Sequence, residues 1–253
     1  MKSIHLLLMS AAVLLAGCPV TQPQDTPVDA QGVTVPRTET SAKLYVPSYY
    51  NEDRQWPLVV TLHGTYGWDG HRRQVMEWKA LAEEHGFIVA APQLESTQGI
   101  LPLIPGMWEK DLAEDEQTIL SLIDHLAGRY RIDTDHVLLT GFSAGGYPMY
   151  YTGLRNPERF DMLIARAANC RIDLLEKIEL TDAVRKLPVF IYVGKSDLKP
   201  LRDQSWEAFR YLRQRGCRLV EREDAEGGHL RRPGIAWEQW AKRLPETYRN
   251  AGR

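Results

Sequence analysis

The chain contains 253 residues, 43% of them hydrophobic, and its 31 basic and 33 acidic residues give a formal charge of −2. This near-neutral balance gives no indication of a nucleic-acid partner or of a polyanionic substrate. Beyond the N-terminal segment, roughly two hundred residues remain, which is enough for one domain whose core needs neither metal nor disulfide support.

Residues 1–17 have the composition of a signal peptide. A basic start at Lys2 precedes an apolar stretch, Ile4 to Leu15, that is too short to span a membrane. The sequence from Leu15 to Cys18 (Leu-Ala-Gly-Cys) resembles the bacterial lipobox, in which the cysteine becomes the lipid-modified N-terminus. We therefore expect a lipoprotein of the bacterial cell envelope, anchored at Cys18 and facing the periplasm or the cell surface. An ordinary cleaved signal peptide with an incidental cysteine is the alternative.

Residues 18–40 are rich in proline, threonine and glutamine without a helical period, so we expect a flexible tether there. The folded domain is expected over residues 41–253. Strand-like and helix-like stretches alternate in it, which predicts a single α/β domain, a mostly parallel central sheet with helices on both faces. We expect strands at residues 43–46, 58–62, 87–91, 136–140, 160–168, 188–193 and 217–221, and helices at residues 73–85, 112–130, 204–215 and 235–244.

The run from Gly141 to Gly146 contains the pattern G-x-S-x-G, with Ser143 at its centre. An apolar strand-like run precedes it and a helix-compatible stretch follows. In that context the pattern is typical of a nucleophile elbow, in which the serine sits on a sharp strand-to-helix turn. A side chain at Gly141 or Gly145 would crowd this turn. A chance match is the alternative, but the flanking elements favour a catalytic Ser143.

His229 is the expected general base. In hydrolases with this elbow the chain order is nucleophile, acid, histidine, and His229 is the only histidine that follows Ser143. It lies in a glycine-rich loop after the strand-like residues 217–221, where it can reach the carboxyl edge of the sheet. A surface loop histidine without a role is the alternative.

Asp197 is the expected acid, because it ends a β-rich apolar run whose carboxyl end would present catalytic side chains. His229 would take the proton of Ser143, and Asp197 would fix the imidazole tautomer. Asp224 is the runner-up, although it lies only five residues before His229. Asp203 is expected to be a helix N-cap. The remaining candidates flank another strand-like run or lie in a helix-like stretch: Asp161, Asp173 and Asp182.

Oxyanion donors are expected from two backbone segments. Residues 56–65 read as a strand that breaks into a glycine loop at Gly64, where one N–H donor is expected. The other is the N–H of Ala144, next to the nucleophile. His63 precedes the serine, so we expect it to shape the loop rather than to act as the base.

Taken together, these segments resemble the α/β-hydrolase superfamily. The resemblance rests on Leu62-His63-Gly64, on Trp108, on residues 115–133 and on residues 141–146, and it covers residues 42 to 240. Within the superfamily the chain most resembles secreted polyhydroxybutyrate depolymerases and feruloyl esterases. The resemblance implies a Ser-His-Asp serine esterase that needs no cofactor, with Thr65 and Ala144 as oxyanion donors. Those depolymerases usually carry a cysteine where Thr65 and Tyr66 stand here, and we expect no appended substrate-binding domain in this chain.

A short acyl or aryl ester is the expected substrate. Residues 92–110 form an apolar loop after a strand and would line one wall of the pocket. Three aromatic side chains could stack on a sugar or a phenolic acid, or could simply pack: Tyr66, Trp108 and Tyr147. Arg231 and Arg232 could meet an anionic group, but a solvated arginine pair is the preferred interpretation.

Cys170 and Cys217 are expected at opposite edges of the sheet, which is too far apart for a disulfide. No motif in the sequence is typical of a metal-binding site. Two further functions stay open at this point. A prolyl oligopeptidase-type serine peptidase uses the same triad order, and an inactive, membrane-anchored ligand-binding protein could keep the fold.

Overall fold

A computed structural model describes residues 30–98, 107–217 and 219–249. The predicted signal peptide, Cys18 and most of the predicted tether lie outside the described residues. Residues 99–106 of the predicted pocket loop also lie outside them.

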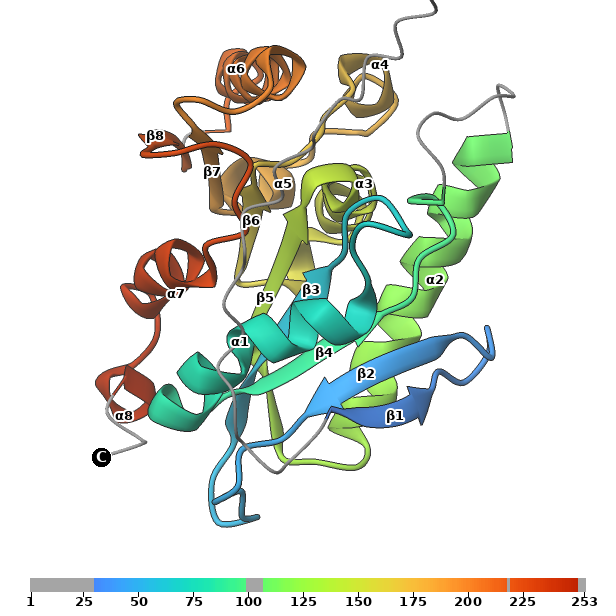
Figure 1. Ribbon diagram of the computed structural model, residues 1–253, viewed down its shortest axis with the longest axis vertical. Coiled ribbons are helices and arrows are strands. Elements are labelled where there is room, and N and C mark those ends of the chain that lie inside the picture. The colour runs from blue at the N-terminus through green and yellow to red at the C-terminus, as the bar shows by residue number, and fades with distance from the viewer. Residues whose placement is uncertain (1–29, 99–106, 218, 250–253) are drawn as a thin grey trace, which may run out of the picture.

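Within the described residues, eight strands form one sheet in the order β1-β2-β4-β3-β5-β6-β7-β8 (Figure 1). The pairs β1–β2 and β2–β4 are antiparallel, and all other neighbours are parallel. The strands are β1 (Gln31–Thr34), β2 (Ser41–Tyr45), β3 (Trp56–Leu62), β4 (Ile88–Pro92), β5 (Ile132–Phe142), β6 (Met162–Arg166), β7 (Val189–Gly194) and β8 (Val220–Ala225).

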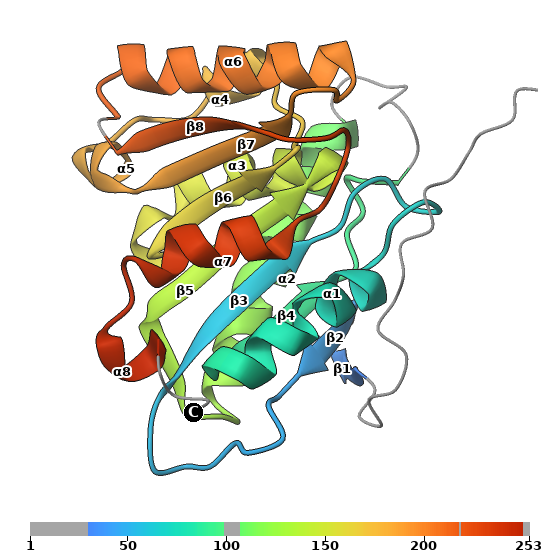
Figure 2. The ribbon, with the colours of Figure 1, turned by 60° about the vertical axis from the view of Figure 1, so that its left-hand side comes forward.

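Helices cover both faces of the sheet. Figure 2 shows α1 and α7 in front of the sheet, with α2 and α3 behind it. The helices are α1 (His71–His85), α2 (Met107–Ala127), α3 (Gly146–Arg155), α4 (Ile172–Leu175), α5 (Asp182–Lys186), α6 (Lys199–Gln214), α7 (Pro233–Ala241) and α8 (Glu246–Arg249), and two 3₁₀ turns are η1 (Ser143–Gly145) and η2 (Pro157–Arg159).

The apolar core is divided by the sheet into two layers. Leu58, Val60 and Leu62 of β3 point to the layer formed with α2, α3 and α6. Val59, between them, points to the layer formed with α1 and α7. Both faces of β3 are buried because side chains alternate along a strand and parallel sheets are covered on both sides. The predicted α/β-hydrolase architecture is therefore confirmed.

The predicted tether extends too far toward the domain. Residues 31–34 form β1, which pairs antiparallel with β2 from Gln31 opposite Leu44 to Thr34 opposite Ser41. Val35 directly after it is fully buried. This strand lies at the sheet edge with mostly exposed side chains, so it lacks the apolar alternation that marks a strand in a sequence. The described fold thus starts near residue 30 rather than at residue 41.

In the part of the chain that the structure describes, no helix combines the length and the apolar composition needed to cross a bilayer. In the same residues, no group of three or more histidine, cysteine or acidic side chains is arranged to hold a metal ion. Cys170 and Cys217 are both buried free thiols, and burial raises the pKa of each.

Candidate active site

Ser143 lies at a sharp turn between β5 and α3. Its φ of 51° is in the left-handed region, which is strained for a residue with a side chain. A Cβ on Gly141 would lie 2.3 Å from the carbonyl oxygen of Gly145, and a Cβ on Gly145 would lie 2.6 Å from the carbonyl oxygens of Leu62 and His63. Only glycine fits at these two positions. The strand–turn–helix geometry expected from the motif is present, and it leaves Ser143 half-buried at the end of β5.

Asp197 and His229 form a hydrogen-bonded pair at the same edge of the sheet. The Nδ1 atom of His229 lies 3.1 Å from Oδ2 of Asp197. The carboxylate side chain is completely buried, whereas the imidazole is 31% exposed. Oδ1 of Asp197 accepts a second hydrogen bond, 2.6 Å long, from the N–H of Leu198. A carboxylate held this way fixes Nδ1 of the imidazole as the donor, which leaves Nε2 as the base.

The imidazole lies beside the nucleophile turn. The ring of His229 packs on that of Phe142, the residue directly before Ser143, with 4.6 Å between ring centroids. Among the described residues, no hydrogen bond joins His229 to the hydroxyl of Ser143. Such bonds often form only when substrate is bound. The structure thus brings Asp197 and His229 into contact and places both at the turn that carries Ser143.

The other candidate acids are engaged elsewhere. Asp224, the runner-up, forms two hydrogen bonds of 2.9 and 2.7 Å with Arg222. Asp203 is not an N-cap, because α6 begins earlier than expected, at Lys199, and Asp203 pairs with that lysine one turn before it. The remaining three bond to neighbouring polar side chains: Asp161 to Trp240 and Arg243, Asp173 to Arg171, and Asp182 to Arg185.

Residues 63–70, which we name the oxyanion loop for their predicted role, follow β3 and run past the serine. A Cβ on Gly64 would lie 3.0 Å from Cβ of Ser143. His63 is fully buried; its Nδ1 lies 2.8 Å from the carbonyl oxygen of Gly64, and its Nε2 accepts from the N–H of Leu94. Burial lowers the pKa of His63. The neutral imidazole therefore shapes this loop, as expected.

The two predicted oxyanion donors are backbone N–H groups without a hydrogen-bond acceptor in the described residues. The N–H of Gly64 is already bonded to Asp69 at 2.8 Å. The N–H of Thr65 has no acceptor among the described residues. Ala144 lies in the first turn of η1, where N–H groups have no partner within the helix. Among the described residues the N–H groups of Thr65 and Ala144 thus have no acceptor, and their role as an oxyanion hole stays a prediction.

The predicted substrate contacts differ in exposure. Trp108 is only 7% exposed, and its indole N–H donates to the carbonyl oxygen of Ser96 at 3.1 Å. Tyr147 is half-buried and meets Trp108 edge-on at 4.9 Å. Trp108 therefore packs beneath Tyr147. Tyr66 is 49% exposed, on the oxyanion loop.

The sequence interpretation missed Trp68, which is 68% exposed two residues after Tyr66. Both residues line a hollow of about 360 Å³ together with His71 and Met76 at the start of α1. The sequence signal for Trp68 is the pair Gly67 and Gly70, which marks a turn that presents the side chain of Trp68.

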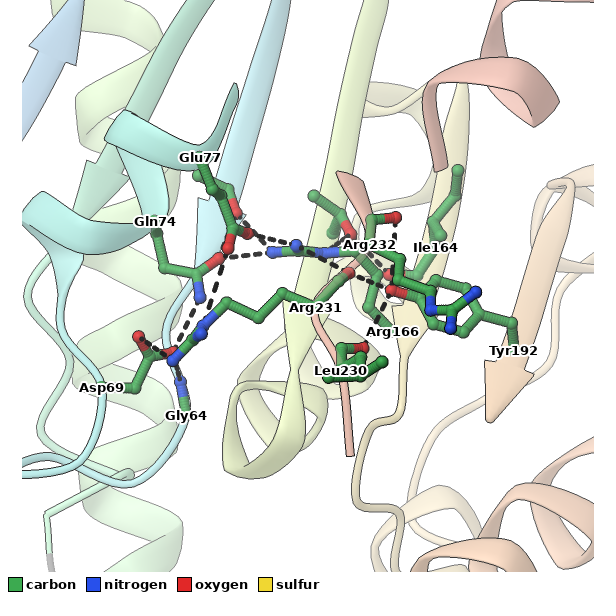
Figure 3. Close-up of polar contacts among 12 residues, drawn as sticks. Gly64, Asp69, Gln74, Glu77, Ile164, Arg166, Tyr192, Leu230, Arg231 and Arg232 are labelled. Atoms are coloured by element: carbon green, nitrogen blue, oxygen red, sulfur yellow. Dashed lines mark hydrogen bonds and ion pairs between the residues drawn. The ribbon is translucent and has the colours of Figure 1, made fainter. Parts of the chain in front are cut away.

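Arg231 corrects another expectation. Its side chain is 17% exposed and lies 3.4 Å from Asp69 and 3.6 Å from Glu77 (Figure 3). The preferred interpretation of a solvated arginine pair is therefore wrong for Arg231. The two acids come from segments about 150 residues earlier in the chain, so the sequence alone could not place them.

The strained serine turn beside a histidine that bonds to a buried aspartate agrees with the comparison with known families. The sequence model of the Esterase family matches residues 34–250. The chain belongs to this family. A ferulic acid esterase from Anaeromyces mucronatus has a similar fold, with a TM-score of 0.62 and 16% identity, over 88% of this chain and 94% of that one. An S-formylglutathione hydrolase from Agrobacterium tumefaciens gives a TM-score of 0.62 and 18% identity, over 85% and 95% of the two chains.

One curated relative of this Esterase family member is the bifunctional acetylxylan esterase/xylanase XynS20E of Neocallimastix patriciarum. It is 31% identical over 108 residues. The match covers 43% of this chain and 15% of that longer protein. The similarity is therefore to a small part of a two-activity protein.

Proposed function

We propose that this protein is a serine hydrolase that cleaves carboxylic esters through an acyl-enzyme intermediate. The observation that carries the proposal is the strained Ser143 beside the hydrogen bond between the buried Asp197 and the partly exposed His229. Membership of the Esterase family supports it independently.

In the proposed mechanism, Oγ of Ser143 attacks the ester carbonyl carbon while Nε2 of His229 takes the hydroxyl proton. Asp197 stabilises the imidazolium that forms. The imidazolium then gives its proton to the leaving alcohol as the ester C–O bond breaks. A water molecule, deprotonated by His229, attacks the acyl group and releases the acid and free Ser143.

The N–H groups of Thr65 and Ala144 are the proposed oxyanion donors in both steps. Each such donor typically lowers the barrier by about 3 kcal/mol. The N–H of Gly64 is held by Asp69, which leaves Thr65 as the donor that this loop can aim at the oxyanion.

We propose short acyl or aryl esters as substrates, among them acetyl or feruloyl esters carried on sugars. The names of the acetylxylan esterase and ferulic acid esterase relatives support this class. The exposed rings of Tyr66 and Trp68 on the oxyanion loop also support it, because aromatic faces suit sugar and phenolic rings. Rates on acetyl-sugar, feruloyl-sugar and hydroxyalkanoate esters would rank the three classes.

The reaction class can be tested with p-nitrophenyl acetate beside a panel of peptide amides. We expect ester turnover by the wild-type protein and a loss of several orders of magnitude for Ser143→Ala. Amide turnover without ester preference would indicate a peptidase instead. No turnover and no reaction with a fluorophosphonate would indicate an inactive binding protein.

A lipid anchor at Cys18 remains part of the proposal. Growth with an alkyne-tagged fatty acid should label the full-length chain expressed in a bacterium, and Cys18→Ser should remove the label. Labelling that survives this substitution would contradict the anchor.

A further inference from the structure

A cluster of four charged side chains, two buried and two partly buried, connects the oxyanion loop with the loop that carries His229. Arg166 and Arg231 supply two positive charges, and Asp69 and Glu77 supply two negative charges. Figure 3 shows Arg166 and Arg231 directed toward Glu77 and Asp69, with Arg232 pointing the opposite way. We name residues 226–232, between β8 and α7, the histidine loop.

Arg166, at the end of β6, is the fixed centre of this cluster. It is completely buried, and all five of its N–H donors have acceptors. They bond to Thr61 of β3, Gln74 and Glu77 of α1, Thr140 of β5, and the carbonyl oxygen of Arg231. Burial raises the pKa of Glu77, although Arg166 beside it opposes that shift. One guanidinium group therefore joins two central strands, α1 and the histidine loop.

Arg231 is held at both ends. Its carbonyl oxygen accepts from Arg166 at 3.3 Å and also from the hydroxyl of the buried Tyr192. Its guanidinium reaches across the ring of Phe142, 4.9 Å from the ring centroid, to Asp69 of the oxyanion loop. The backbone of the histidine loop is thus anchored independently of the Arg231 side chain.

Asp69 connects the Arg231 side chain to the backbone of the oxyanion loop. Its Oδ2 accepts from the N–H of Gly64 at 2.8 Å and from Gln74 at 2.7 Å, while Oδ1 faces Arg231. Gly64 in turn directly precedes Thr65, the proposed oxyanion donor. A chain of contacts through the Arg231 side chain therefore runs from the loop of the proposed base to the loop of the proposed donor, around the ring that precedes Ser143. A second route runs from the carbonyl oxygen of Arg231 through Arg166 and Gln74 to Asp69.

Buried ion pairs seldom add net stability, because the desolvation of both charges offsets their attraction. A cluster of charges that joins these two loops is better explained by a role in fixing their relative position. We propose that Arg231 is a positioning residue: through Asp69 it holds the histidine loop and the oxyanion loop in register for catalysis. This inference rests on the proposed esterase function.

Two substitutions interrupt this connection with little disturbance elsewhere. Arg231→Met removes the guanidinium, and Arg166 still pairs with Glu77. Asp69→Asn can keep an oxygen for Gly64 and Gln74 while it places an amide toward Arg231. Arg232→Met is the matched control, because it removes the same charge one residue later, from a side chain that points out of the cluster.

The test measures kcat per active site on p-nitrophenyl acetate, with sites counted by fluorophosphonate titration, together with KM and the thermal midpoint. We expect Arg231→Met and Asp69→Asn each to lower kcat per titrated site by about 10- to 100-fold, because small misplacements cost this much. KM should change less than about threefold. The double variant should be no slower than the slower single variant, because both substitutions break the same connection. Arg232→Met should match the wild type.

Three results would overturn the inference alone: an unchanged kcat per titrated site with fewer sites or a lower midpoint, multiplicative losses in the double variant, or an equal loss in Arg232→Met. A purely structural role gives the first of these. A wild-type protein that neither reacts with the fluorophosphonate nor turns over the ester would overturn the proposed function itself, and the inference with it.

Discussion

The end of β7 and the histidine loop touch at backbone level: a Cβ on Gly194 would lie 2.2 Å from the carbonyl oxygen of Gly228. Gly194 ends the strand that leads to Asp197, and Gly228 directly precedes His229. The proposed acid and base thus meet because neither backbone carries a side chain where the two segments cross.

Gly194→Ala should displace the histidine loop. We expect kcat to fall by about 100-fold, because the imidazole moves relative to Ser143, and stability to fall by about 1–3 kcal/mol from overpacking. Ester kinetics and urea unfolding measure the two effects. Gly234→Ala is the control, since a Cβ there meets no atom within 4 Å; an equal loss in that variant would contradict the explanation.

Asp197→Asn should lower kcat by about 10⁴-fold, because the amide can no longer fix the catalytic tautomer of His229. Asp224→Asn should leave kcat unchanged, since Asp224 is exposed and pairs with Arg222. Steady-state kinetics on one ester compares the two. If Asp224→Asn proves the more damaging change, Asp197 is not the acid.

Trp68 and Trp108 should respond in different ways to truncation. Trp68→Ala should raise KM for feruloyl-sugar esters by about tenfold, as expected for one lost stacking contact of ~1.4 kcal/mol, and should spare p-nitrophenyl acetate. Trp108→Ala should cost about 3–5 kcal/mol of stability, because the ring is buried. Kinetics and chemical unfolding separate the two; an unchanged KM in Trp68→Ala on every glycosyl ester would remove Trp68 from the site.

Asp115 should make stability depend on pH. Burial raises its pKa to about 7, despite hydrogen bonds from Ser96 and Glu95. A carboxyl group with a raised pKa in the folded state binds more protons than in the unfolded state. The contribution of Asp115 to the free energy of unfolding is therefore full at acid pH and is lost as pH rises from about 4 through about 7.

Urea unfolding at pH 5, 6, 7 and 8 measures this dependence. The unfolding free energy of the wild type, taken relative to Asp115→Asn, should fall across the series. A difference that is flat or rises with pH would show that the carboxyl group is ionised throughout.

The sequence was sufficient for the features that are encoded locally. The turn at Ser143 follows from its glycines, since Gly141 and Gly145 lie at backbone contact with their neighbours. The alternation of strand-like and helix-like stretches predicted a mostly parallel sheet with helices on both faces. The contact between Asp197 and His229 could be predicted, because chain order and strand ends limit where candidate catalytic residues can lie.

The sequence could not predict features that depend on contacts between residues far apart along the chain. Arg166 bonds to Thr61, 105 residues earlier, and to the carbonyl oxygen of Arg231, 65 residues later. Nothing near Arg231 in the sequence distinguishes it from its neighbour Arg232. Likewise, the burial of Trp108 under Tyr147 depends on how α2 packs against α3, and β1 owes its strand to pairing with β2 rather than to its own pattern.

The most direct test of the central claim is mass spectrometry of the intact protein, quenched in acid within the first turnovers of p-nitrophenyl acetate, followed by peptide mapping. We predict one added acetyl group on Ser143 in the wild type, no adduct in Ser143→Ala, and a longer-lived adduct in His229→Ala wherever acylation still occurs. Rapid ester turnover that persists in Ser143→Ala, or an acetyl group confined to another residue, would contradict the assignment of Ser143 as the nucleophile.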